Sequence, residues 1–134
     1  MTHDINIHHE DNHESASSYL VEEIRNLLGN SNKDFSIGLS GGNTPKLTYS
    51  MMAEKFDDLS KTYLWTIDDR WIEEDNELSN QRMINEYFER TEANILKFEF
   101  TSSSPESDEK KYEDKLKSTI QIFDVAILGM GEDG

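Results

Sequence analysis

The chain has 134 residues, with 13 lysines and arginines against 28 aspartates and glutamates, so its formal net charge is −15 at pH 7. This length predicts a single α/β domain over residues 1–134, and the negative charge excludes a binder of nucleic acid or of anionic membranes. The sequence has no cysteine, no signal-peptide pattern and no apolar run near the roughly 20 residues of a membrane span, so we expect a cytoplasmic protein.

Apolar runs and helical patterns alternate along the chain after a candidate edge strand at residues 4–9. Further strands are predicted at residues 35–39, 62–67, 95–100 and 123–128. Helices are predicted at residues 14–28, 44–55, 79–88 and 105–117. The apolar face expected for the first helix comprises Ala16, Tyr19, Leu20, Ile24, Leu27 and Leu28. Strands that alternate with helices predict an α/β fold, a three-layer sandwich with a mostly parallel, Rossmann-like sheet.

Ligands of such sheets collect at the carboxyl ends of the strands, and the first of three informative stretches there is SGGNTP, residues 40–45. Gly41 and Gly42 permit backbone geometries and close approaches that a side chain forbids. Asn43 or Thr44 can cap the next helix, and Pro45 suits its first turn. Free amides and the helix dipole at such a turn favour a phosphate, although the same residues also suit a turn that binds nothing.

The second stretch is DDRWIEEDNELSN, residues 68–80, where an apolar strand ends in two carboxylates and an arginine. Arg70 can fork onto a phosphate, and Asp68 can hold a substrate hydroxyl or act as a base. The alternative is a solvated charged surface in which Ser79 and Asn80 only cap a helix.

The third stretch is GMGEDG, residues 129–134, which matches the dinucleotide fingerprint GxGxxG and places Asp133 after a tight glycine turn. The fingerprint also needs a helix that opens from the glycines and an acidic residue roughly 20 positions further on, and the sequence supplies neither. An ordinary exit from a strand is the other interpretation. The histidines at positions 3, 8, 9 and 13 lie outside these stretches, and we expect them to be solvated rather than to bind a metal.

The order and spacing of the three stretches resemble the 6-phosphogluconolactonase family, within the wider group that contains the glucosamine-6-phosphate deaminases. That family carries SGGxTP, DERWVPPDxxxSN and LGMGxDGH after successive strands, and this chain has SGGNTP, DDRWIEEDNELSN and LGMGEDG in the same order. The deaminases have DEY and a glycine where this chain has Asp68, Asp69 and Arg70, and they lack the pattern from Asp75 to Asn80. The resemblance therefore favours the lactonase over the deaminase and over a dinucleotide site.

The resemblance implies hydrolysis of 6-phosphogluconolactone to 6-phosphogluconate in the oxidative pentose phosphate pathway, without metal or cofactor. In the family a histidine that follows GxGxDG is the candidate base for the attacking water, and this sequence ends one position before it. We therefore expect the amino-terminal part of a longer enzyme, with a small sugar phosphate as ligand. A deaminase-like or isomerase-like enzyme and a noncatalytic sugar-phosphate-binding fragment are the alternatives.

The resemblance also implies roles for individual residues of this chain. Phosphate binding is carried over to the residues Ser40, Gly41, Gly42, Asn43, Thr44 and Arg70. Asp68 and Asp133 are the catalytic candidates, beside the sugar or the histidine of the family.

The chain departs from the family's pattern in the second stretch. Asp69 stands where the family has a glutamate, and Glu73 and Glu74 replace a proline pair, which adds negative charge near an anionic substrate. The run at residues 123–128 is apolar on both faces, so we also expect self-association through an exposed part of the sheet.

Overall fold

A computed structural model describes residues 3–130 of the chain. Strands and helices alternate along these residues, as predicted. The strands are β1 (Phe35–Leu39), β2 (Thr62–Thr66), β3 (Asn94–Leu96) and β4 (Val125–Ile127). The helices are α1 (His13–Gly29), α2 (Lys46–Lys55), α3 (Asn80–Phe88) and α4 (Pro105–Thr119).

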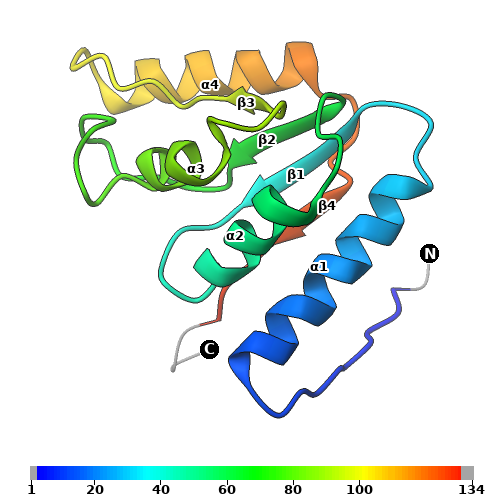
Figure 1. Cartoon of the computed structure of the whole chain (residues 1–134). Helices are drawn as coiled ribbons and strands as arrows, with labels where there is room; N and C mark the ends of the chain where they lie inside the picture. Colours follow the sequence, from blue (N-terminus) through cyan, green and yellow to red (C-terminus); the bar gives the residue numbers. More distant parts are fainter. Residues whose placement is uncertain (1–2, 131–134) are drawn as a thin grey trace.

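The strands form one sheet in the order β3-β2-β1-β4, and every pair is parallel. Ile37 of β1 lies opposite Leu64 of β2 on one side and Val125 of β4 on the other. The chain therefore moves from β1 outward to β3 and then crosses back to β4 at the other edge (Figure 1). The predicted parallel α/β sheet is confirmed.

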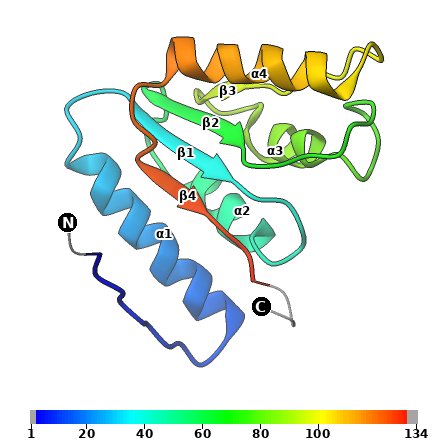
Figure 2. The ribbon, with the colours of Figure 1, turned by 180° about the vertical axis from the view of Figure 1, so that it is seen from behind.

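Helices cover both faces of this sheet, which makes the predicted three layers. The helices α2 and α3 follow strands that advance in one direction, and right-handed crossovers therefore place both on the same face. The helix α4 connects β3 back to β4 in the opposite direction and lies on the other face (Figures 1 and 2). The helix α1 packs against α2 and extends the first helical layer.

The core lies between the sheet and the layer of α1, α2 and α3. Its fully buried large side chains include Ile37, Leu39, Leu64, Ile84 and Phe88.

Tyr49 of α2 is also fully buried in this core, and its hydroxyl donates a 2.7 Å hydrogen bond to the carbonyl of Ser40, directly after β1. Burial raises the pKa of Tyr49 to about 12. Tyr49 is therefore neutral at physiological pH, and its hydroxyl fixes the carboxyl end of β1 to the core.

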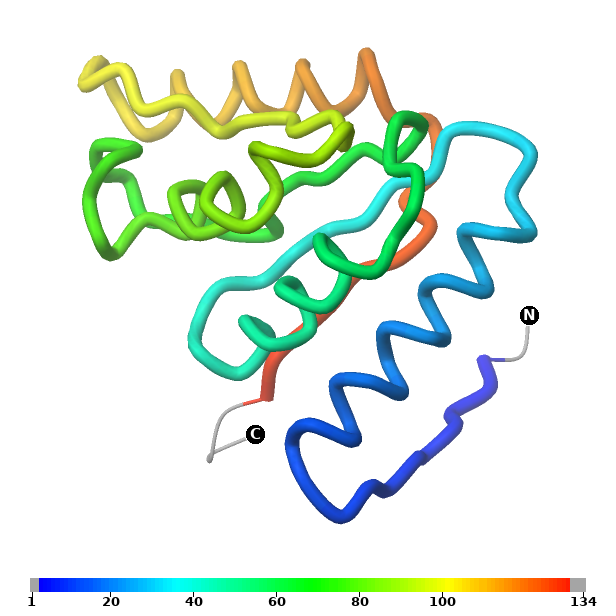
Figure 3. Tube along the Cα trace, viewed as in Figure 1, coloured from blue at the N-terminus to red at the C-terminus, as the bar shows by residue number. Residues whose placement is uncertain are grey.

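The amino-terminal segment is not the predicted edge strand. Residues 3–12 have no strand pairing and run alongside α1, away from the sheet (Figure 3). The His8 ring stacks on Tyr19 of α1 at 3.4 Å, and Ile5 and Ile7 remain exposed. The segment therefore packs on a helix surface, where no strand edge is available to accept its backbone hydrogen bonds.

The buried face of α1 matches the predicted one in part, because Ile24 is buried and Leu20 and Leu28 pack against the core. Ser17, Val21 and Ile24 are buried, whereas Tyr19 and Leu27 are exposed. The helix packs against α2.

The strands β3 and β4 are shorter than predicted because side chains take the backbone hydrogen bonds of the flanking residues. The amide of Phe98 donates to the side chain of Gln81, and the Lys115 ammonium donates to the carbonyl of Lys97. Before β4, the Asp124 carboxylate accepts from the amide of Ser36 at 2.9 Å. No helix within residues 3–130 is both long and apolar enough to cross a bilayer.

The buried phenol of Tyr49 predicts a loss of stability at alkaline pH. The unfolded tyrosine releases its proton near pH 10, whereas the folded one keeps it to about pH 12, so the free energy of unfolding should fall by roughly 3 kcal/mol across that window. Tyr49→Phe should show a shallower fall there and a loss of about 1 kcal/mol at neutral pH. Urea unfolding below and above pH 10 measures both effects, and an unchanged alkaline slope would contradict the assignment.

The exposed edge at β4 keeps self-association as a prediction. Beside this edge Phe123 is 59% exposed and Leu128 73% exposed, and within residues 3–130 β4 pairs only with β1. We expect light scattering to show dimers or larger species at high protein concentration, and Leu128→Glu to reduce them. A monomer at all concentrations would contradict this prediction.

Candidate functional site

The carboxyl ends of β1, β2 and β4 meet at one edge of the sheet, where a hollow of about 350 Å³ opens. From β1 the strand order runs outward to β3 on one side and to β4 on the other, and parallel sheets bind ligands at such a switch point between neighbouring strands. The lining residues are Ser40, Gly41, Gly42, Thr44, Pro45, Asp68, Arg70, Asn80, Gly129 and Met130. The structure thus brings together the predicted residues of the first two stretches. Asn43 lines an adjoining hollow, and Asp133 lies outside the described residues.

The glycine loop, residues 40–44 after β1, exposes its backbone to this hollow. Gly42 has a φ of 89°, a conformation that side chains disfavour. The hydroxyl oxygen of Ser40 is buried and has no hydrogen-bond partner among residues 3–130. A buried hydroxyl without a partner is costly, and the Ser40 hydroxyl is available to hydrogen-bond a ligand in the hollow.

The start of α2 differs from the prediction. The helix begins at Lys46 with Pro45 in the cap position, and neither Asn43 nor Thr44 provides a side-chain cap. The amide of Lys46 donates instead to the carbonyl of Asn43 at 3.3 Å. Because no side chain caps this end, the positive end of the helix dipole faces the loop without a side-chain oxygen to neutralise it.

Asn80, at the start of α3, contacts both the glycine loop after β1 and the loop after β2. A Cβ atom on Gly41 would lie 2.1 Å from the Asn80 Oδ1 atom, so only glycine allows this approach. Asn80 Nδ2 donates to the carbonyl of Asp68 at 3.0 Å, and Asn80 Oδ1 accepts from Arg70 Nη1 at 3.1 Å. Asn80 is buried. It therefore holds both ends of the second stretch against the glycine loop.

Asp69 connects the exit of β2 with α3. Its carboxylate accepts from the amide of Asn80 at 2.7 Å, from that of Gln81 at 3.0 Å and from that of Arg70 at 2.8 Å. Ser79 caps the same helix by accepting from the Arg82 amide at 3.1 Å. The amino end of α3 is thus saturated by the protein, and the aspartate, although shorter than the family's glutamate, has a complete set of partners.

Arg70 is exposed, and two neutral oxygens hold its guanidinium. Nη1 donates to the carbonyl of Leu78 and to Asn80 Oδ1, both at 3.1 Å. Within residues 3–130 no carboxylate lies within ion-pair distance of Arg70, although Asp68 and Asp69 flank it in the sequence. The charge of Arg70 is therefore available to an anion.

The carboxylate of Asp68 is exposed at the rim of the hollow. Its backbone is fixed, because its carbonyl accepts from the Thr66 hydroxyl at 2.6 Å and from Asn80 Nδ2. The side chain makes no hydrogen bond within residues 3–130 that would prevent it from contacting a ligand.

Glu74 does not add charge to the hollow, contrary to the prediction from the sequence. It pairs with Lys97 at 3.4 Å and accepts from Asn85 at 2.6 Å. Neither Glu73 nor Glu74 lines either of the two adjoining hollows.

Two contributors were missed by sequence reasoning. Asn80 was interpreted only as a cap, and Lys46 was not singled out. Lys46 lines the adjoining hollow of about 320 Å³, whose other charged lining residues are Arg70, Arg82, Glu77 and Glu86. The position of Lys46, directly after SGGNTP at the start of a helix, is the signal that could have identified it.

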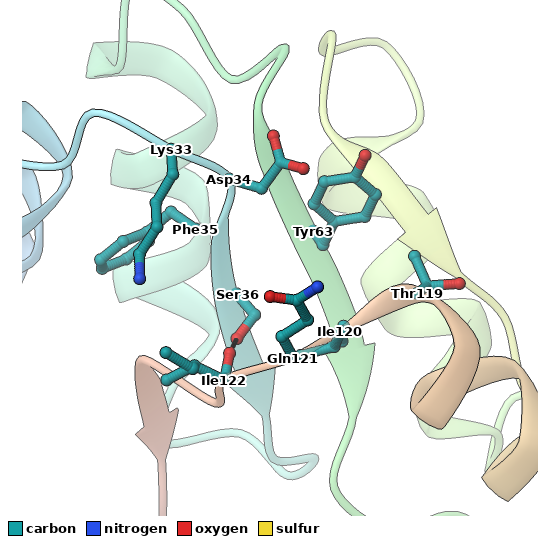
Figure 4. A pocket seen from close by; sticks show the side chains of 9 residues that line it. All are labelled: Lys33, Asp34, Phe35, Ser36, Tyr63, Thr119, Ile120, Gln121 and Ile122. Atoms are coloured by element: carbon teal, nitrogen blue, oxygen red, sulfur yellow. Dashed lines mark hydrogen bonds between the residues drawn. The ribbon is translucent and has the colours of Figure 1, made fainter.

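A separate hollow of about 200 Å³ lies at the amino ends of β1 and β2, beside the end of α4 (Figure 4). Lys33, Tyr63 and Gln121 are among its lining residues, and Ser36 donates to the carbonyl of Ile122 at 2.5 Å. None of the predicted site residues lines this hollow. Residues 3–130 contain no group of three or more histidine, aspartate or glutamate side chains placed to hold a metal ion.

Comparisons with known proteins identify the family of the chain. A family model described as glucosamine-6-phosphate isomerases/6-phosphogluconolactonase matches residues 8–134. The 6-phosphogluconolactonase of Thermotoga maritima is 36% identical over 123 residues, which cover 87% of this chain and 56% of that protein. The 6-phosphogluconolactonase of Synechocystis sp. is 34% identical over 110 residues, 74% of this chain and 46% of that protein.

A crystal structure of a 6-phosphogluconolactonase from Shewanella baltica superposes with a TM-score of 0.82 at 27% identity, over 93% of this chain and 56% of that one. The chain spans about half the length of the curated relatives it matches. By the family model and by these identities, the chain belongs to the glucosamine-6-phosphate isomerase/6-phosphogluconolactonase family.

Proposed function

We propose that the chain supplies the phosphate-binding and sugar-binding loops of a 6-phosphogluconolactonase, which hydrolyses 6-phosphogluconolactone to 6-phosphogluconate. The relatives named above carry this activity in their names. The reaction belongs to the oxidative pentose phosphate pathway, and we assign it to the cytoplasm. The observation that carries the proposal is the availability of Arg70 beside the glycine loop.

Arg70 keeps its charge for a ligand in a chain whose net charge is −15. Neutral oxygens orient the guanidinium from one side, through Nη1. A guanidinium has five N–H donors in a rigid fork that matches phosphate, and the remaining donors are left for two oxygens of the same anion. Beyond a Debye length of about 8 Å salt screens the other acidic residues, so local donors decide the affinity.

The loop of Ser40 to Thr44 supports the proposal from the opposite side of the hollow. Its backbone amides and the uncapped start of α2 favour an anion, by roughly 0.3–1 kcal/mol and up to ~2 where the site is partly buried. The orphaned hydroxyl of Ser40 adds a neutral hydrogen-bonding group. A phosphate held between this loop and Arg70 would place the lactone ring toward Asp68.

The hydrolytic step needs a base that takes a proton from water as the water attacks the lactone carbonyl. Within residues 3–130, the lining of the two hollows contains no histidine. We propose that Asp68 and Asp133 hydrogen-bond the sugar hydroxyls and orient the attacking water. A carboxylate is a weaker base than imidazole at neutral pH.

A deaminase-like activity is less well supported. The bond between Arg70 and Asn80 joins two positions of the lactonase motif that the deaminase motif lacks. Binding without catalysis remains the main alternative for these 134 residues.

Replacement of Arg70 provides the first test. Arg70→Ala should weaken 6-phosphogluconate binding about ten- to hundredfold, because a charge-assisted hydrogen bond contributes about 1.5–3 kcal/mol. Arg25→Ala is the matched control, since it removes the same charge from an exposed position on α1 where Arg25 pairs with Glu22. Isothermal titration calorimetry measures both affinities. Equal losses for the two variants would contradict the assignment of Arg70.

Turnover provides the second test. We expect the 134-residue chain to bind 6-phosphogluconate without accelerating lactone hydrolysis, because a general base typically contributes 10²–10⁴-fold. A version extended by the histidine-containing segment of a relative should restore turnover. The lactone also opens spontaneously, so rates are compared with and without protein in the same buffer. Hydrolysis by the 134-residue chain that Asp68→Asn abolishes would show that a carboxylate suffices as the base.

A further inference from the structure

Asp108 is a buried carboxylate of α4, on the face of the sheet opposite the layer of α1, α2 and α3. It lies in the first turn of α4 and is 1% exposed. Its oxygens accept from the Thr101 amide at 2.8 Å, from the Thr101 hydroxyl at 2.5 Å and from Trp71 Nε1 at 3.0 Å. The hydrogen bonds from Thr101, and then the one from Trp71, hold the pKa of Asp108 below its usual value. The proposed hydrolysis does not use this carboxylate.

The bond to Trp71 matters because Trp71 is the residue after Arg70. On the other side of Arg70, the Asp69 carboxylate is tied to the amides of α3. The backbone of Arg70 is therefore anchored at both neighbours, to α3 through Asp69 and to α4 through Trp71. Phe100 packs edge-on against the Trp71 indole at 5.1 Å and steadies the second anchor.

The loop before α4 is shaped to serve this carboxylate. Ser102 has a φ of 65°, which is uncommon for a residue with a side chain. This turn brings Thr101 back over the first turn of α4, where both its donors reach Asp108. The carboxylate is thus held in one orientation, with one oxygen presented to Trp71.

We propose that Asp108 is a positioning residue, which fixes Trp71 and thereby holds Arg70 in the orientation that a phosphate needs. That the ligand of Arg70 is a phosphate rests on the proposed function. The effect of Asp108 on the orientation of Arg70 does not depend on a ligand and is measured separately.

The experiment combines two changes to the anchor with one control. Trp71→Phe removes the Nε1 donor but keeps a ring against Phe100, and Asp108→Asn removes the charge of the acceptor. Asp114→Asn, at an exposed position of the same helix where Asp114 pairs with Lys110 at 3.1 Å, controls for the loss of one negative charge. Trp71→Phe leaves the Thr101 bonds intact, so it keeps the test valid if Asp108→Asn does not fold.

Affinity for 6-phosphogluconate is measured by calorimetry under conditions in which circular dichroism shows each variant to be folded. We expect Trp71→Phe and Asp108→Asn to raise the Kd about five- to tenfold and Asp114→Asn to leave it unchanged. In an Arg70→Ala background the same two changes should have no further effect, because a residue that acts through Arg70 has nothing left to position. Unchanged affinity in the original background, or an equal loss in both backgrounds, would overturn the proposal.

A ligand-free measurement separates this proposal from the proposed function. The Arg70 side-chain Nε–Hε signal in NMR, assigned by its loss in Arg70→Lys, should shift or broaden in Trp71→Phe and Asp108→Asn but not in Asp114→Asn. If the wild type binds no 6-phosphogluconate, the proposed function fails, and a change of this signal still supports the positioning. An Arg70 signal that neither variant alters refutes the positioning whatever the chain binds.

Discussion

The carboxylate of Asp69 holds the exit of β2 against the first amides of α3, and the rest of the site depends on this contact. Hydrogen bonds from Asn80 and Gln81 end on its two oxygens, at 2.7 and 3.0 Å. A carboxylate at the positive end of a helix is stabilised by the helix dipole as well as by the amides. Arg70 follows Asp69 in the sequence, and Asn80 is the first residue of α3. The contact between Asp69 and α3 therefore brings Arg70 and Asn80 within hydrogen-bond distance of each other.

The parallel sheet places these groups together, and two tyrosines keep its strand exits rigid. Tyr49 donates from α2 to the carbonyl after β1, and Tyr112 donates from α4 to the carbonyl of Thr66, the last residue of β2, at 2.8 Å. Burial raises the pKa of both phenols, so both are neutral donors at physiological pH. Each exit is thus fixed from a different helical layer, and the loops that follow start from defined positions.

Local sequence patterns predicted most of the fold because the signals are themselves local. The buried strand β1 has large apolar residues at three of its five positions, Phe35, Ile37 and Leu39. The helix α4 begins at Pro105 after the cap residue Ser104, as the sequence signals indicate. The amino-terminal segment was predicted wrongly because an alternating apolar pattern does not show whether a sheet edge is available. The short ends of β3 and β4 were missed because they depend on side chains distant in the sequence, such as Gln81.

The site was predicted only in part for the same reason. The glycines and Arg70 stand in recognisable stretches, and the structure places them at one hollow. The role of Asn80 depends on three partners, at Gly41, Asp68 and Arg70, which lie in separate segments. No pattern within a single segment distinguishes such a residue from an ordinary helix cap.

The distribution of charge explains how a chain with a net charge of −15 can present a site for an anion. Two acidic residues close to the site are occupied elsewhere, Asp69 by amides and Glu74 by Lys97 and Asn85. Arg70, in contrast, is oriented by a carbonyl and an amide oxygen, which do not neutralise it. An ion pair with either neighbouring carboxylate would remove the attraction for a phosphate, so the use of neutral partners for Arg70 is what the proposed function requires of this fold.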